Sequence, residues 1–251
     1  MRNPVKEKLR RGEVTLGVAV GTPCLDLVEM LSRMNFDWIW FDAEHGPLNT
    51  EILQAMLQVG RGGQATSIVR VPWNDLVHIK KALDVGAQGL IIPWVNTREQ
   101  AEMAVRAAKY PPEGIRGIGP RWVATAGEDT AEYLRTANDE VLIIVQIETR
   151  EAVNNLEAII TTPGIDAFLI GPSDLAASLG HLGDNAHPDV QATIDDIIER
   201  GKKAGVPGGF ATAPPAECEK RIKQGFQLIT IGSDLGFIRQ GAQAVLAHFG
   251  R

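Results

Sequence analysis

Short runs of apolar and β-branched residues recur along the chain at regular intervals. Eight such runs occupy residues 15–20, 38–43, 66–71, 89–94, 142–148, 167–171, 208–212 and 228–233. Most are continuous and not alternating, which is typical of parallel strands that are covered on both faces. The pattern therefore predicts eight parallel strands.

Helical periodicity fills the intervals between these runs. Apolar residues repeat at three- and four-residue spacing in 51–59, 76–85, 99–108, 152–160, 190–204 and 235–249. Thr97 and Gln100 have the spacing of a capping box, and Gly86 and Gly205 stand where helices are expected to end. Strands that alternate with helices in a chain of this length predict an α/β fold, a single-domain (β/α)8 TIM barrel over residues 1–251. An open doubly wound sheet is the alternative.

One segment departs from this rhythm. Residues 110–140 are rich in Gly, Pro and charge, and a connection of this length inside a compact domain is usually functional. We predict a short helix within it, around 130–137.

Composition narrows the class of protein. The 251 residues are 44% hydrophobic and 22% charged, with a net charge of −6, which argues against nucleic acid or an anionic membrane as the main partner. No apolar run is long enough to span a bilayer, and the polar start lacks a signal-peptide pattern. Cys24 and Cys218 lack metal-site spacing and suit a reducing compartment, so we expect a cytoplasmic protein.

Candidate chemistry gathers where the predicted strands end, because the active site of such a barrel lies at the C-terminal ends of its strands. Each of these residues alone has an ordinary structural interpretation, such as a helix cap or an ion pair. Their convergence on one end of the barrel favours function, since charges gathered there cost stability unless they are paired. The candidates are Asp42, Glu44, His45, Arg70, Gln146, Glu148, Gly171, Pro172, Ser173, Asp174, Ser233 and Asp234.

These residue types indicate metal-assisted chemistry on a keto acid. Two carboxylates without a nearby Cys or further His make a site of hard oxygen ligands, which suits Mg²⁺, Mn²⁺ or Co²⁺. A bound 2-keto acid would be polarised by the ion, and Arg70 offers a fork of donors for an enolate oxygen or a carboxylate. His45, with Asp42 three residues earlier, is the expected proton shuttle.

The sequence lacks the residues for Schiff-base chemistry and the motifs for nucleotide binding. A Schiff-base aldolase needs a buried lysine at a strand end, and none of the nine lysines falls there. Dinucleotide and P-loop fingerprints do not follow any predicted strand. Gly208, Gly209, Gly232 and Ser233 leave a weak indication of a phosphate site near the last two strands.

Six stretches carry a resemblance to a known family. They are DWIWFDAEHGPLN (37–49), VRVPWND (69–75), LDVGAQGLIIPWVNT (83–97), YPPEGIRGIG (110–119), VQIETREAVNNL (145–156) and GIDAFLIGPSDLAASLG (164–180). Together they resemble the HpcH/HpaI family of class II 2-keto acid (pyruvate) aldolases, typified by 4-hydroxy-2-oxo-heptanedioate aldolase and by 2-keto-3-deoxy sugar acid aldolases.

The resemblance implies a role for each candidate. It implies a divalent metal on Glu148 and Asp174, His45 and Arg70 as catalytic residues, and Asp42 as the partner of His45. Gln146, Gly171, Pro172 and Ser173 would surround the keto acid, and Glu44 would orient water beside the metal. It further implies a homohexamer, a trimer of dimers, in which Asp84 reaches a neighbouring active site.

The expected reaction is the reversible cleavage of a 4-hydroxy-2-keto acid to pyruvate or hydroxypyruvate and an aldehyde. We expect Arg121 and Trp122, in the long 110–140 segment, to meet the aldehyde. The alternatives are oxaloacetate decarboxylation or malyl-type cleavage at the same metal–enolate site, a phosphosugar isomerase or epimerase, and a barrel without catalytic activity.

Overall fold

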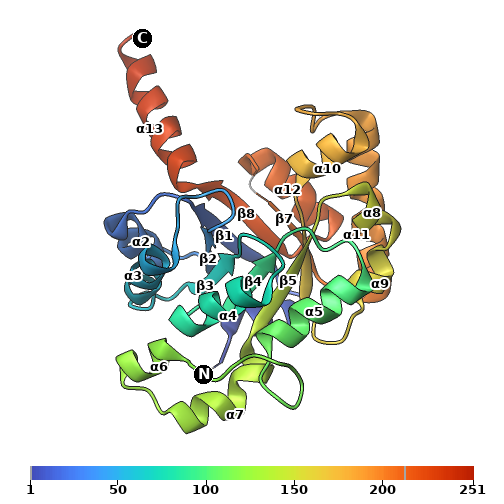
Figure 1. The fold of residues 1–251 in the computed structure, drawn as a ribbon. Coiled ribbons are helices and arrows are strands. Elements are labelled where there is room, and N and C mark those ends of the chain that lie inside the picture. Colours follow the sequence, from blue (N-terminus) through green and yellow to red (C-terminus); the bar gives the residue numbers. More distant parts are fainter. Residues whose placement is uncertain (1, 212) are drawn as a thin grey trace.

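The strands of the computed structural model, which describes residues 2–211 and 213–251, close into a barrel (Figure 1). Each strand pairs in parallel with the next, and β8 pairs with β1, so the predicted (β/α)8 barrel is confirmed. The strands are β1 (Thr15–Val20), β2 (Trp38–Asp42), β3 (Thr66–Arg70), β4 (Gly89–Ile92), β5 (Leu142–Ile147), β6 (Ala167–Ile170), β7 (Gly208–Phe210) and β8 (Leu228–Ser233). Each lies within its predicted run; the last residue of the 208–212 run, Thr212, lies outside the described residues.

Helices surround the barrel, and every range of helical periodicity is helical. The helices are α1 (Pro4–Arg10), α2 (Leu25–Ser32), α3 (Thr50–Gly60), α4 (Leu76–Val85), α5 (Arg98–Ala108), α6 (Arg121–Ala126), α7 (Thr130–Glu140), α8 (Arg150–Asn154), α9 (Leu156–Ile160), α10 (Pro172–Leu179), α11 (Pro188–Ala204), α12 (Pro215–Gln224) and α13 (Asp234–His248). Of these, α1, α2, α6, α10 and α12 lie outside the ranges of helical periodicity. The helix predicted over 152–160 is two helices that meet at Asn155, whose side-chain amide donates to the Asn96 carbonyl at 2.8 Å. This bond anchors the break between α8 and α9 to the loop after β4.

The predicted helix ends are present. Thr97 and Gln100 form the complete capping box at the start of α5. Gly86 and Gly205 end α4 and α11 with φ of 121° and 71°, a region of backbone conformation that glycine enters at little cost.

Alternation along each strand separates two apolar layers. Trp40, Ile68, Ile144 and Leu169 belong to one buried cluster inside the barrel, whereas their sequence neighbours pack outward against the helices. The inner cluster continues at the N-terminal end of the strands into Val5 and Leu9 of α1. The helix α1, which the sequence suggested was only a polar start, therefore closes the base of the barrel and leaves the other end as its mouth.

Two parts of the chain lie away from the barrel wall. The α6–α7 segment sits at the base, near the N-terminus, and α13 projects from the mouth end into solvent (Figure 1). In the described part of the chain, no helix combines the length and apolar character needed to cross a membrane.

Candidate active site

The inward positions of the strands change from apolar to polar at the mouth. One step beyond the layer of Trp40, Ile68 and Ile144, the same inward positions carry Asp42, Arg70 and Gln146. The register pairs Asp42 directly with Arg70 across β2 and β3. Continuation of the same alternation past β5 brings Glu148 one step above Gln146, so four predicted residues line the mouth.

Arg70 lies at the centre of this layer and is 7% exposed. Its guanidinium donates to both oxygens of Asp42, from Nε at 3.0 Å and from Nη2 at 2.6 Å. Nη1 lies 2.9 Å from Glu44 Oε2 and 3.5 Å from Gln146 Oε1. The group also stacks over the Trp40 ring at 4.5 Å, so its orientation is fixed from several sides.

Glu148 follows β5 and is 1% exposed. One carboxylate oxygen accepts from the Trp94 backbone N–H at 2.8 Å, and the other accepts from the Gln146 side-chain amide. Burial, the largest cause, raises the pKa of Glu148 against the two hydrogen bonds, and with the smaller effect of the negative charges of Glu44 and Asp174 the pKa is about 7. A carboxyl group with this pKa is about half protonated at neutral pH.

Trp94 is a residue that the sequence reasoning did not single out. It is a non-glycine residue with positive φ, 56°, and this backbone turn aims its N–H at Glu148. Its exposed ring stacks on that of Trp73 with 5.7 Å between centroids, which holds the loops after β3 and β4 together. A non-glycine residue in this conformation stores strain, and such strain clusters at functional sites.

The segment after β6 lies against Gln146 and Glu148 and forms one wall of the candidate site. Gly171 packs so closely that an added Cβ would lie 2.9 Å from Gln146 Nε2 and 3.0 Å from Glu148 Oε2. Pro172 opens α10, and Asp174 lies in the first turn of that helix. The hydroxyl of Ser173 accepts a hydrogen bond from the Asn185 amide at 3.1 Å. The structure thus assembles Gln146, Glu148 and the 171–174 segment in one place.

His45 lies on the loop after β2 with its side chain 64% exposed. Its backbone N–H donates to Asp42 Oδ1 at 3.2 Å, as does that of Glu44. The acid near its imidazole is Glu44, whose Oε2 lies 3.8 Å from Nε2. Asp42 therefore holds the backbone of this loop and the Arg70 side chain, whereas the sequence analysis expected it to contact the imidazole.

The charges of the layer fit a bound cation. Four acids, Asp42, Glu44, Glu148 and Asp174, gather at the mouth, and the guanidinium of Arg70 pairs with the first two. Burial, the largest cause, and the charges of Asp42 and Asp174 raise the pKa of Glu44 against the pull of Arg70. Its Oε2 forms an ion pair with Arg70 but no aligned hydrogen bond. An oxygen-rich site with surplus negative charge suits a hard divalent ion.

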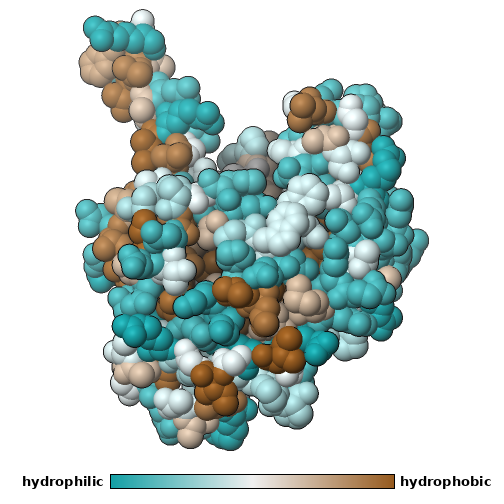
Figure 2. All heavy atoms as spheres, viewed as in Figure 1, coloured by the Kyte–Doolittle hydropathy of each residue, from teal (hydrophilic) through white to brown (hydrophobic). Residues whose placement is uncertain are grey.

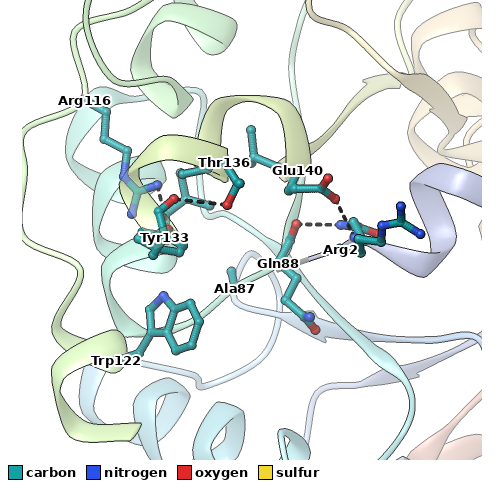
Figure 3. Close-up of a pocket in the computed structure, with 12 residues that line it drawn as sticks. Arg2, Ala87, Gln88, Arg116, Trp122, Tyr133, Thr136 and Glu140 are labelled. Carbon is teal, nitrogen blue, oxygen red and sulfur yellow. Dashed lines mark hydrogen bonds between the residues drawn. The ribbon is translucent and has the colours of Figure 1, made fainter. Parts of the chain in front are cut away.

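Asp84 lies at the opposite end of the barrel. It pairs with Arg116 at 3.1 Å, beside a small hollow that residues of α4, α6, α7 and the segment before α1 line at the base (Figure 3). This hollow has a volume of about 30 Å³, room for one or two water molecules and too little for a keto acid. Asp84 therefore does not meet the mouth of its own chain.

Trp122 is also at the base. Its ring packs against Tyr133 and under the Arg61 guanidinium, and it lines the same hollow (Figure 3). The expectation that Arg121 and Trp122 meet the aldehyde is therefore wrong for a substrate bound in the same chain. The predicted helix within 110–140 is α7, and the shorter α6 precedes it.

The remaining candidates have structural roles. Asp234 accepts from the backbone of Gly21 and Thr22, and Ser233 caps α13. A Cβ at Gly208 would meet the Phe168 ring at 2.8 Å, and one at Gly209 would meet Leu169 at 2.8 Å, so these glycines are required for packing. The weak indication of a phosphate site is thereby explained without a ligand.

The nine lysines belong to α1, α4, α11 and α12 or end α5, and none lies on a strand of the described residues. Lys6, the most buried, bonds to Asp166 and the Val141 carbonyl at the base. The mouth therefore offers carboxylates, a guanidinium and an imidazole, but not the amine that a Schiff base requires.

The chain is similar to known proteins over most of its length. The profile of the HpcH/HpaI aldolase/citrate lyase family matches residues 22–240. A 4-hydroxy-2-oxo-heptane-1,7-dioate aldolase of Klebsiella pneumoniae subsp. pneumoniae is 39% identical over 250 residues, which are 99% of this chain and 94% of that protein.

Solved structures show the same similarity. An HpcH/HpaI aldolase/citrate lyase family protein of Burkholderia cenocepacia superposes with a TM-score of 0.94 at 34% identity, over 99% of this chain and all of that one. The citrate synthase SbnG has a TM-score of 0.87 at 27% identity, over 98% of this chain and 96% of that one.

Proposed function

The chain belongs to the HpcH/HpaI aldolase/citrate lyase family, and on this premise we propose that it is a metal-dependent class II aldolase, a carbon–carbon lyase. It cleaves 4-hydroxy-2-keto acids reversibly to pyruvate, or hydroxypyruvate, and an aldehyde. The observation that carries the proposal is the burial of Glu148 near two further acids, which raises its pKa to about 7. A bound cation would lower this pKa and keep the carboxylate ionised at neutral pH.

Glu148 and Asp174 would hold this cation, which we propose to be Mg²⁺, Mn²⁺ or Co²⁺ because the donors are carboxylate oxygens. The bound ion supplies a Lewis acid that polarises the keto group. Gln146, whose amide lies against both Glu148 and Arg70, orients the first of these acids. Gly171, Pro172 and Ser173 form the wall on which the keto acid lies.

Arg70 stabilises the charge that forms on the keto oxygen during cleavage. Its guanidinium is already oriented by Asp42, Glu44 and Trp40, so it needs no reorganisation as that charge develops. The planar fork also matches a carboxylate or enolate geometrically, which a lysine ammonium cannot.

His45 moves the proton of the reaction. In cleavage, it accepts the proton of the C4 hydroxyl while the C3–C4 bond breaks, the aldehyde forms, and the electron pair passes to the pyruvate fragment. The fragment then takes a proton at C3 and leaves as pyruvate. Exposure of the imidazole at the mouth and its position 3.8 Å from Glu44 support this role, since solvent can restore its protonation state.

Assembly into a homohexamer is part of the proposal. Leu235, Ile238, Val245, Leu246 and Phe249 are all exposed along or beside α13, between 47% and 73% of their surface (Figure 2). An apolar stripe on a helix that touches little of its own barrel is typical of a subunit interface. Asp84, remote from the mouth of its own chain, would then contribute to the active site of a neighbour.

The compartment we propose is the cytoplasm. Both cysteines are free thiols, and Cys218 is buried next to carbonyl oxygens without a disulfide partner. Such thiols persist in a reducing compartment.

A substrate panel tests the proposed reaction. The metal-loaded protein should release pyruvate from 4-hydroxy-2-keto acids, including 4-hydroxy-2-oxo-heptanedioate, the compound named in the 39% identical relative. In reverse, it should join pyruvate or hydroxypyruvate to aldehydes. Decarboxylation of oxaloacetate without cleavage of any 4-hydroxy-2-keto acid would overturn the aldolase assignment and leave the decarboxylase alternative.

A further inference from the structure

Two histidines and an aspartate converge on the rim of the barrel, outside the layer of Arg70 and Glu148. His181 follows α10, His187 caps the start of α11, and Asp189 lies in the first turn of α11. One nitrogen of each imidazole and one carboxylate oxygen lie within 4.8 Å of one another. Among the described residues, this is the one group of three or more such side chains that meets at this distance.

Two separations are close to those between ligands of a small tetrahedral ion. His181 Nε2 lies 3.3 Å from Asp189 Oδ2, and His187 Nδ1 lies 3.7 Å from the same oxygen. Zinc binds imidazole nitrogen and carboxylate oxygen at about 2.0–2.2 Å, so tetrahedral ligands stand about 3.3–3.5 Å apart. The donor set is also selective, since imidazole favours Zn²⁺, Co²⁺ or Ni²⁺ over Mg²⁺.

Two local adjustments would accompany an ion. The imidazoles are stacked with centroids 3.5 Å apart and planes at 15°, and each ring must turn because its lone pair lies in its own plane. Their side chains are 23% and 32% exposed, so both have room to turn. The Asp189 N–H donates to His187 Nδ1 at 3.2 Å, longer than the usual distance of about 2.9–3.0 Å. The ion would replace this hydrogen bond.

We propose that His181, His187 and Asp189 form a second divalent-metal site that prefers Zn²⁺ or a similar borderline ion. It differs from the Glu148–Asp174 site in donors, place and selectivity. Three protein ligands leave one tetrahedral position for water.

The site would anchor the loop between α10 and α11. Within this loop, Asn185 donates to Ser173 Oγ at 3.1 Å and accepts from the Gln191 side chain at 2.7 Å. Asn185 and Ala186 border a recess of about 480 Å³ with Pro172 and Phe210. An ion at His181 and His187 would therefore fix one wall of this recess next to the proposed keto-acid site.

Zinc stoichiometry in a variant that lacks the other metal site tests the proposal. The parent is full-length Glu148→Gln/Asp174→Asn protein, stripped with a chelator, loaded with Zn²⁺, dialysed and assayed for bound metal. We expect one zinc per chain, retained against about a hundredfold excess of Mg²⁺. Binding should weaken in acid, because protons compete with the ion for histidine ligands.

Matched variants in this parent identify the ligands. His181→Ala and His187→Asn should each release the zinc; Asn at 187 keeps a side chain that can cap α11, so helix loss is not the cause. His78→Ala, which removes an exposed histidine on α4, should retain it. Circular dichroism checks that each variant is folded. A parent that binds no zinc, or zinc that stays in the folded His181→Ala/His187→Asn variant, would overturn the proposal.

Discussion

Arg70 and Asp42 face each other from paired positions of β3 and β2, and the guanidinium donates two hydrogen bonds to the carboxylate, at 2.6 and 3.0 Å. The barrel register thus pre-orients this guanidinium beside the acids of the mouth. Because Asp42 also accepts from the backbone of Glu44 and His45, a single carboxylate links the guanidinium to the proposed proton shuttle.

Substitution of Arg70 tests its role in the transition state. Arg70→Ala should lower kcat for cleavage by about two orders of magnitude or more, because the charge it stabilises forms mainly during the reaction. Arg70→Lys should recover only part of this loss, since a point charge does not reproduce the fork. Steady-state kinetics of the metal-saturated variants measures both. A raised KM with unchanged kcat in Arg70→Ala would reduce the residue to an anchor for the substrate carboxylate.

Substitution of His45 separates proton transfer from metal chemistry. His45→Ala should slow cleavage by roughly a hundredfold, whereas oxaloacetate decarboxylation should change much less because it deprotonates no hydroxyl. Glu148→Ala and Asp174→Ala should lose both activities. The measurement is the ratio of the two rates in each folded variant. Equal loss of both rates in His45→Ala would show that His45 is not the proton shuttle.

Gly171 offers a test of packing at the site. In Gly171→Ala, the new Cβ would lie 2.9 Å from Gln146 Nε2 and 3.0 Å from Glu148 Oε2, so it must displace them. We expect kcat/KM to fall by roughly a hundredfold, because small displacements of catalytic groups have effects of this size. Gly21→Ala is the control at the same end of the barrel, where an added Cβ meets nothing within 4 Å. Equal activity of the two variants would contradict the proposed wall.

The metal-free protein should show an unusual pH dependence of stability. Glu148 has a pKa of about 7 in the folded chain, against about 4.3 in an unfolded one. Between these values the folded state holds a proton that the unfolded state has lost, so this residue makes the free energy of unfolding fall as the pH rises through the window.

Urea unfolding of the wild type and Glu148→Gln, both without metal, measures this contribution between about pH 5 and pH 7. The wild type should lose more stability than the variant as the pH rises, and Mg²⁺ should restore stability to the wild type alone. Parallel curves for the two proteins would contradict the raised pKa.

The sequence was sufficient for the barrel because its strands are buried on both faces. Every residue of β5 is buried, and such a nearly continuous apolar run predicts a strand even when the neighbouring strand is unknown. The strand ends then located Asp42, Arg70 and Glu148 through the general rule for the barrel mouth.

Contacts between segments that are far apart in the sequence could not be predicted from it. The positive φ of Trp94 and its N–H bond to Glu148 depend on how the loops after β4 and β5 meet. The apolar periodicity of residues 235–249 predicted a helix, but the same pattern suits packing on the barrel and projection from it. Trp122 is likewise far from the mouth because the 110–140 segment folds back to the base of the barrel, and the sequence pattern does not reveal this path.

The central claim is that this chain breaks a carbon–carbon bond with a metal and not with a lysine. The most direct measurement is pyruvate release from 4-hydroxy-2-oxo-heptanedioate by chelator-treated protein, before and after addition of Mg²⁺, Mn²⁺ or Co²⁺, with borohydride trapping in parallel. We predict no release without metal, recovery with at least one of the three ions, and no mass gain after borohydride. Release that persists without metal, together with a borohydride-trapped lysine adduct, would contradict the account.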